Sequence, residues 1–201
     1  MILGIDFDNT IICYDDVFYK IALEKNLIHN TLKRNKTVIR NFLRNQGKEK
    51  EWTKLQGYVY GKRIIESKPY EGVIEFMNFC KINGINVHII SHKTVKPYSG
   101  ENFNLHKAAY HWLDHNGFVE KLLTQRQISF MLTKEDKIQK ILDLKCAYFI
   151  DDLPEFLVHL NFPKATKRIL FDPLNQHSEC SQHLIRKQSW SDIIKYFNSY
   201  I

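Results

Sequence analysis

The stretch Ile2-Leu3-Gly4-Ile5-Asp6-Phe7-Asp8-Asn9-Thr10 places two acids at the end of a short hydrophobic run. Such a run is typical of a parallel strand whose two faces are both buried. Two later runs of the same kind, 85–91 and 146–150, end in Ser91 and in the pair Asp151-Asp152. Helical patterns separate the runs, so we predict an α/β fold with a Rossmann-like, doubly wound parallel sheet.

The remaining periodicity predicts further elements and a division into domains. Helices are expected over 71–83, 105–115, 133–144 and 190–200, and shorter strands at 128–131 and 168–171. Residues 14–67 contain no proline and carry apolar residues at helical spacing, which indicates three or four helices and no strand. We therefore predict an α/β core domain over 1–13 and 68–201, and a small helical cap over 14–67 inserted after the first strand.

Composition limits the classes of protein and partner. The 201 residues are 44% hydrophobic and 25% charged, which suits a globular chain with one core and an insertion. The formal net charge of +7 favours anionic partners such as phosphate esters, nucleotides or nucleic acid. No apolar run approaches the ~20 residues of a membrane span, and the first residues lack the basic segment of a signal peptide. We expect a cytoplasmic protein with no membrane partner.

The four cysteines are scattered, which is typical of reduced, buried residues. The pattern His177-x-x-Cys180-x-x-His183 offers zinc-binding residue types, but its spacing is not that of a common zinc site. A polar loop leading into a helix is the favoured interpretation of this segment.

Carboxylates and a hydroxyl follow three strands of the predicted sheet. In an open parallel sheet, ligands bind beyond the carboxyl ends of the strands, where the strand order reverses. Carboxylates that gather at such an edge repel one another unless a cation lies among them, and oxygen ligands suit Mg²⁺. We therefore predict a Mg²⁺ site formed at the ends of the strands by Asp6, Asp8, Asp151 and Asp152.

The same residues carry a resemblance to a known family. The segment Asp6-Phe7-Asp8-Asn9-Thr10 resembles the DxDxT nucleophile motif of the haloacid dehalogenase superfamily, and Ser91 resembles its second motif. A lysine near the start of helix 133–144 resembles the third motif, and Ile150-Asp151-Asp152 resembles the acidic fourth. Each residue by itself would suit a turn, a helix cap or a solvated surface. Their shared order over residues 6–152 favours a catalytic site.

The resemblance implies roles for these residues. Asp6 would attack phosphorus as a nucleophile, and Asp8 would act as general acid and then general base. Thr10 would support the turn, and Ser91 would hydrogen-bond a phosphoryl oxygen. Mg²⁺ would be held by Asp6, the backbone carbonyl of Asp8 and Asp151, with Asp152 bonding a coordinated water.

Two lysines compete for the third motif. Lys137 lies fourteen residues before Asp151, a spacing that resembles family members with a paired aspartate, and we prefer it. Lys134, seventeen residues before Asp151, is the alternative, because at the first helical position its side chain could fold over the strand ends.

The substrate is less closely defined. His92 and Lys93 follow Ser91 directly and are predicted to bind an anionic substrate, although a polar surface loop would have the same composition. The resemblance implies a cap that covers the site and selects a small phosphorylated metabolite or nucleotide. Nucleic-acid ends are a second candidate substrate, because basic and aromatic residues interleave around Trp52 and over 58–63. The sequence is also compatible with a non-catalytic regulatory domain and with a phosphotransferase.

Overall fold

A computed structural model describes residues 1–177 and 183–199. The chain forms two compact units, each built from separate stretches of sequence. The first unit comprises Met1–Ile12, Pro69–His92 and Gly117–Ile201, and the second comprises Cys13–Lys68 and Lys93–Asn116. The segment 93–116, which the sequence analysis placed in the core domain, thus belongs to the second unit together with residues 13–68.

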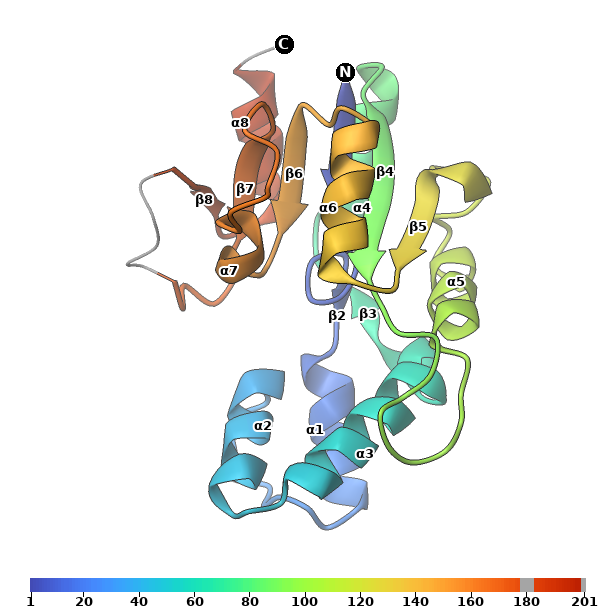
Figure 1. Ribbon diagram of the computed structural model, residues 1–201. Helices are drawn as coiled ribbons and strands as arrows, with labels where there is room; N and C mark the ends of the chain where they lie inside the picture. The colour runs from blue at the N-terminus through green and yellow to red at the C-terminus, as the bar shows by residue number, and fades with distance from the viewer. Residues whose placement is uncertain (178–182, 200–201) are drawn as a thin grey trace. The chain divides into compact units, whose positions relative to one another are not determined.

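The first unit contains a parallel sheet, as predicted, and this sheet has six strands (Figure 1). The strand order is β5-β4-β1-β6-β7-β8. The strands are β1 (Ile2–Ile5), β4 (Asn86–His92), β5 (Ile128–Met131), β6 (Tyr148–Asp151), β7 (Lys167–Phe171) and β8 (Ile185–Lys187). The sequence analysis did not predict β8, because an edge strand of three residues with two cations carries no hydrophobic signal.

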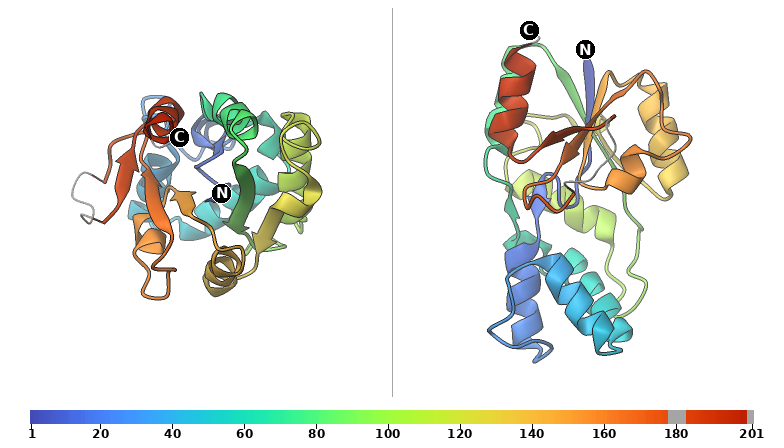
Figure 2. Two further views of the ribbon diagram at one scale, coloured as in Figure 1. Left: turned by 90° about the horizontal axis from the view of Figure 1, so that it is seen from above. Right: turned by 90° about the vertical axis from the view of Figure 1, so that its left-hand side faces the viewer.

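Helices cover both faces of this sheet, which is the doubly wound arrangement expected (Figure 2). One face carries α6 (Lys134–Asp143) and α7 (Pro154–Leu157), and the other carries α4 (Val73–Ile82) and α8 (Trp190–Asn198). A short 3₁₀ turn, η2 (Gln125–Gln127), leads into β5. The side chain of Thr133 caps α6 by accepting from the backbone N–H of Asp136 at 3.0 Å, which satisfies a helix donor that would otherwise lack a partner.

The strand order reverses at β1, the central strand. The chain first extends the sheet on one side through β4 and β5, and then on the other side through β6, β7 and β8. Ile5 pairs with Ile89 of β4 and with Ile150 of β6. The next residue, Asp6, donates its backbone N–H to the carbonyl of Ile150 at 2.9 Å. Asp6 therefore lies at the switch point where open α/β sheets bind ligands.

A tight turn follows β1. The carbonyl of Phe7 accepts from the backbone N–H groups of Thr10, Ile11 and Ile12 at 3.4, 3.0 and 3.2 Å. Asn9 has a φ of 57°, a left-handed conformation that asparagine tolerates better than most residues. The chain then enters β2 (Ile12–Cys13), which pairs with β3 (Lys68–Pro69) in a separate two-stranded ribbon.

The second unit is helical, as predicted for residues 14–67. Two glycines of one helix explain why the segment 93–116 packs here. A Cβ at Gly57 would lie 2.6 Å from Pro97, and one at Gly61 would lie 2.4 Å from Phe103, so only glycine lets this segment approach the helix. Its elements are α1 (Asp15–Glu24), α2 (Lys36–Asn45), α3 (Glu49–Gly61), η1 (Ile64–Glu66) and α5 (Leu105–His115).

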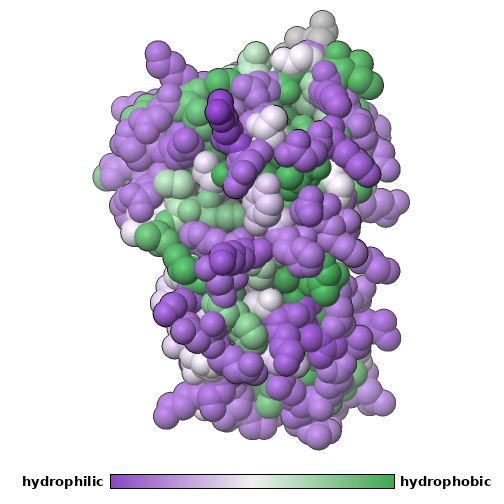
Figure 3. Space-filling view, turned by 90° about the vertical axis from the view of Figure 1, so that its right-hand side faces the viewer, coloured by the Kyte–Doolittle hydropathy of each residue, from purple (hydrophilic) through white to green (hydrophobic). Residues whose placement is uncertain are grey.

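No helix in the described part of the chain is long and apolar enough to cross a membrane. Hydrophilic side chains predominate on the face drawn in Figure 3, and hydrophobic ones appear there in small patches.

The pattern of zinc-binding residue types that the sequence offers includes Cys180, which lies outside the described residues.

Packing of β1 against β6 yields a test of the core. A Cβ at Gly4 would lie 2.4 Å from Cδ2 of Phe149, a ring that is fully buried in the cluster beneath α6 and α7. Gly4→Ala should lower the free energy of unfolding by about 1–3 kcal/mol, measured by urea denaturation, because the ring must shift in a packed core. The cost should shrink in a Phe149→Leu background, and equal costs in both backgrounds would contradict this origin.

Candidate active site

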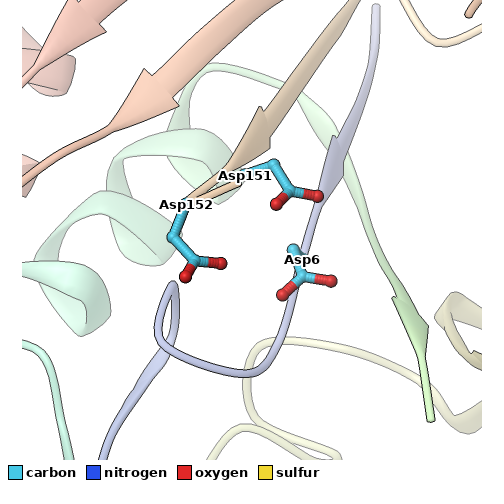
Figure 4. A group of neighbouring side chains, drawn as sticks. All are labelled: Asp6, Asp151 and Asp152. Atoms are coloured by element: carbon cyan, nitrogen blue, oxygen red, sulfur yellow. The ribbon is translucent and has the colours of Figure 1, made fainter. Parts of the chain in front are cut away.

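Three carboxylates converge beyond the carboxyl ends of β1 and β6 (Figure 4). Asp6 follows β1, Asp151 is the last residue of β6, and Asp152 follows it. One oxygen atom from each of the three lies within 4.8 Å of the others. Asp6 and Asp151 are buried and Asp152 is half-buried. Neighbouring parallel strands therefore bring together acids that are 145 or more residues apart in the sequence.

The ammonium group of Lys137 lies between two of these carboxylates. Its Nζ is 2.5 Å from Oδ1 of Asp6 and 2.6 Å from Oδ2 of Asp151. Lys137 belongs to the first turn of α6 and is buried, whereas Lys134 begins the helix and is exposed. Of the two lysines that the sequence analysis considered, the structure thus brings Lys137 into the carboxylate cluster.

Two aromatic rings flank the same ammonium group, and the sequence analysis missed both. The Nζ of Lys137 lies 5.2 Å from the ring centroid of Phe149 and 4.1 Å from that of Phe156. Because side chains alternate along a strand, Phe149 shares a face with Asp151, and this signal was available in the sequence. Phe156 comes from α7, and no local pattern places its ring beside Lys137.

Hydrogen bonds orient the two acids at the end of β6. Oδ1 of Asp151 accepts from the backbone N–H of Leu153 at 2.9 Å, while its Oδ2 accepts from Lys137. The hydroxyl of Thr10, which is fully buried, donates to Oδ1 of Asp152 over 3.4 Å. Thr10 therefore links the turn after β1 to the acid after β6, in addition to the turn-supporting role that we predicted for it.

Ser91 presents a buried polar group at the same end of the sheet. It lies in β4, the neighbour of β1, and only 1% of its surface is exposed. Its hydroxyl has no hydrogen-bond partner among the described residues. A buried hydroxyl is normally paired, so this one is suited to hydrogen-bond a ligand.

The other predicted site residues lie in different places. Asp8 is half-buried in the turn after β1. His92 ends β4, and its Nε2 lies 3.0 Å from the carbonyl oxygen of Leu132. Lys93 is buried in the second unit, where its Nζ is 4.9 Å from the ring centroid of Tyr60 and its carbonyl oxygen is 2.7 Å from Nε2 of His106.

Comparison with solved structures identifies the architecture. A hydrolase of the haloacid dehalogenase family from Deinococcus radiodurans, solved with bound phosphate and sodium, aligns with a TM-score of 0.63 and 11% identity, over 98% of this chain and 94% of that one. The chain has the fold of the haloacid dehalogenase superfamily. No protein-family model and no curated protein sequence matches it.

Other structures with this haloacid dehalogenase fold agree. A superfamily hydrolase from Ehrlichia chaffeensis aligns with a TM-score of 0.53 and 14% identity, over 98% of this chain and 95% of that one. A predicted phosphoglycolate phosphatase from Haemophilus somnus aligns with a TM-score of 0.53 and 13% identity, over 98% of this chain and 97% of that one. The predicted resemblance to the haloacid dehalogenase superfamily is therefore confirmed at the level of the fold.

Burial and neighbouring charges shift the pKa values of the buried cluster in opposite directions. Burial raises the pKa of Asp6 to about 7; the ammonium of Lys137 pulls it down, and the charges of Asp151 and Asp8 push it up. Burial alone would lower the pKa of Lys137, but the carboxylates of Asp151 and Asp6 outweigh it and hold the pKa above its ordinary value. The lysine therefore stays charged, and the carboxylates carry more negative charge than it can balance.

The donor set fits a divalent cation of the kind that the haloacid dehalogenase fold implies. The three converging side chains offer only carboxylate oxygens, the ligand type that Mg²⁺ prefers. With Asp6, Asp151 and Asp152 ionised, Lys137 leaves two negative charges, which one divalent ion would balance.

The raised pKa of Asp6 predicts a pH-dependent gain in stability from Asp6→Asn in metal-free protein. Folded Asp6 binds its proton more tightly than in the unfolded chain, so this stabilisation is complete below pH 4 and is lost as the pH rises to about 7. Asparagine does not titrate, so the variant does not lose this stability as the pH rises. Asp6→Asn should match the wild type in unfolding free energy near pH 4 and exceed it at pH 8 by at most about 4 kcal/mol. A variant less stable than the wild type at pH 8 would contradict this.

The unpaired hydroxyl of Ser91 predicts that Ser91→Ala will not destabilise the ligand-free protein. Removing a buried polar group that has no partner should raise the free energy of unfolding by about 1 kcal/mol, measured by denaturant titration. Ser67→Ala is a matched control in the second unit, because its buried hydroxyl also lacks a partner in the described part of the chain. A fall in stability for Ser91→Ala would indicate a hydrogen bond that holds the fold.

Proposed function

We propose that the protein is a Mg²⁺-dependent phosphomonoester hydrolase that acts in the cytoplasm through an aspartyl-phosphate on Asp6. The contact between Lys137 and both Asp6 and Asp151 carries this proposal. An anionic nucleophile that approaches an anionic phosphate meets repulsion, and a fixed ammonium group beside the nucleophile reduces it. Burial makes that charge count for more than it would in water.

In the first step, an oxygen of the Asp6 carboxylate attacks phosphorus, and the bond from phosphorus to the ester oxygen breaks. The carboxyl group of Asp8 gives its proton to that leaving oxygen, so that an alcohol departs. Lys137 and the hydroxyl of Ser91 donate hydrogen bonds to the charge that develops on the phosphoryl oxygens. The product on the protein is an acyl phosphate of Asp6.

In the second step, the carboxylate of Asp8 takes a proton from water as the water oxygen attacks the same phosphorus. The bond between phosphorus and Asp6 breaks, which releases inorganic phosphate and restores the Asp6 carboxylate. Asp8 recovers its proton in this step and is ready for the next substrate. One residue thus serves as acid and then as base, as reversibility of the two half-reactions requires.

The site would hold Mg²⁺ through the carboxylates of Asp6 and Asp151 and the backbone carbonyl of Asp8, with Asp152 bonding a coordinated water. The ion would supply positive charge that neutralises the acids and the phosphate. Thr10 keeps the Asp152 side chain oriented for this task through its hydroxyl.

The substrate that we propose is a small phosphorylated metabolite or nucleotide. The net charge of +7 favours an anionic substrate. Solved structures with the same fold include a predicted phosphoglycolate phosphatase and a hydrolase with bound phosphate, both at low sequence identity. Of the two residues that follow Ser91, Lys93 remains the one that we expect to contact the substrate, because the ring of His92 is bonded to the carbonyl of Leu132.

Nucleic-acid ends are not favoured as the substrate. The interleaved aromatic residues that suggested base stacking have packing roles in the second unit. Trp52 is buried and its ring stacks on Phe18 with centroids 5.1 Å apart. Arg63 forms ion pairs with Glu24 and Glu66. These side chains are engaged within the protein, so a small phosphate ester is the preferred substrate.

A purely regulatory domain is also not favoured. Burial of a lysine and two aspartates costs free energy that a well-packed apolar cluster would not. A domain without chemistry gains nothing from that cost, whereas a phosphoryl-transfer site does. Transfer to an acceptor other than water would use the same residues, and it would appear as ester cleavage without release of inorganic phosphate.

The decisive experiment is an assay of phosphate release from a panel of phosphate monoesters, with and without Mg²⁺. We expect Mg²⁺-dependent release by the wild type, release at the enzyme-free level for Asp6→Asn, and a loss of about 10²- to 10⁴-fold for Asp8→Asn. Asp114→Asn, which removes an exposed acid of the second unit, should keep full activity. Activity that survives in Asp6→Asn would exclude Asp6 as the nucleophile.

A further inference from the structure

The ring of His92 ties the end of β4 to the turn that precedes α6. Its Nε2 lies 3.0 Å from the carbonyl oxygen of Leu132. A carbonyl oxygen can only accept, so Nε2 carries the proton and donates it. Leu132 is 55% exposed, so its side chain adds little packing there, and the histidine holds this backbone directly.

The same turn determines the position of the backbone from which the Lys137 side chain extends. Leu132 directly precedes Thr133, the residue that caps α6. The carbonyl of Thr133 accepts from the backbone N–H of Lys137 at 3.2 Å. A single residue, Thr133, and one helical hydrogen bond therefore separate the carbonyl that His92 binds from the backbone N–H of Lys137.

Strand pairing does not hold this part of the chain. The register between β4 and β5 ends with His92 opposite Met131, one residue before Leu132. Beyond that pair, the His92 side chain adds a hydrogen bond to the turn before α6, whereas the next turns of α6 are held by the packing of Ile138 and Ile141 in the core. Any shift of this turn moves the start of α6, and with it the stem of Lys137.

We propose that His92 is a positioning residue for Lys137: through the Leu132 carbonyl it holds the first turn of α6 where the Lys137 ammonium meets both Asp6 and Asp151. This inference rests on the proposed role of Lys137, but the positioning is a property of the unliganded protein. It assigns to His92 a function distinct from contact with substrate. Burial lowers the pKa of His92, so the ring is neutral at pH 7 and does not add a repelling charge near Lys137.

Two substitutions separate positioning from other roles. His92→Gln keeps an N–H donor at a reach similar to that of Nε2, whereas His92→Asn keeps one only at the reach of Nδ1. Both are neutral and polar, so they differ mainly in whether the Leu132 carbonyl can be bonded. His111→Asn, at an exposed position of the second unit, controls for loss of a histidine.

Kinetics on the preferred ester then test the proposal. We expect His92→Asn to lower kcat by about 10- to 100-fold with KM changed less than about twofold, because a displaced Lys137 weakens only transition-state binding. His92→Gln should stay within about threefold of the wild type. A rise in KM with kcat unchanged in both variants would overturn positioning and make His92 a substrate contact.

A second measurement needs no activity. The side-chain ¹⁵N resonance of Lys137 should report an ammonium protected from exchange in the wild type, in His92→Gln and in His111→Asn, and should broaden in His92→Asn. Thermal unfolding of each variant shows whether it is folded. If folded His92→Asn kept a wild-type Lys137 signal, the inference would fail even with phosphatase activity intact. If the signal changed as expected in a protein without activity, the positioning would stand and the proposed function would fail.

Discussion

A buried ammonium group held between two buried carboxylates is the interaction on which the site depends. Removing three charges from water is costly, and their mutual attraction offsets that cost only when the geometry is good. The short contacts of Lys137 with Asp6 and Asp151 meet this condition. They require β1 and β6 to be neighbours and α6 to begin above them. The sheet order, the cap at Thr133 and the rings around the lysine all serve that geometry.

Much of the fold could be predicted because its signals are local. Strands buried on both faces are hydrophobic runs, and the ends of β1, β4 and β6 could be read from the polar residues that follow them. Long-range packing left no such trace. The segment 93–116 belongs to the helical unit because Gly57 and Gly61 admit Pro97 and Phe103 against α3, and because Trp112 donates to the carbonyl of Ser67 at 2.8 Å. None of these contacts has a local signature in the sequence.

In the candidate site, too, local signals could be predicted from the sequence and long-range packing could not. Because β1 and β6 are parallel, the proximity of Asp6 and Asp151 could be predicted from the strand ends alone. For the lysine of the site, the sequence left two candidate positions. Residues three apart lie on nearly the same face of a helix, so Lys134 and Lys137 differ mainly by one turn along α6, and only the docking of α6 on the sheet decides which one reaches the carboxylates. The contact of His92 with Leu132 was also out of reach, since a backbone carbonyl carries no residue-specific signal.

The place of β1 in the sheet has a consequence for how the chain is made. It leaves the ribosome before both of its partners, β4 and β6, which begin at Asn86 and Tyr148. At ordinary rates of synthesis, both neighbouring strands of β1 are complete on the order of 10 s after β1 itself. During that interval a short hydrophobic segment followed by Asp6 has neither of its neighbouring strands to pair with. The strand at the switch point of the sheet thus waits for both of its neighbours, and Asp6 and Asp8 place carboxyl groups beside its hydrophobic residues during that time.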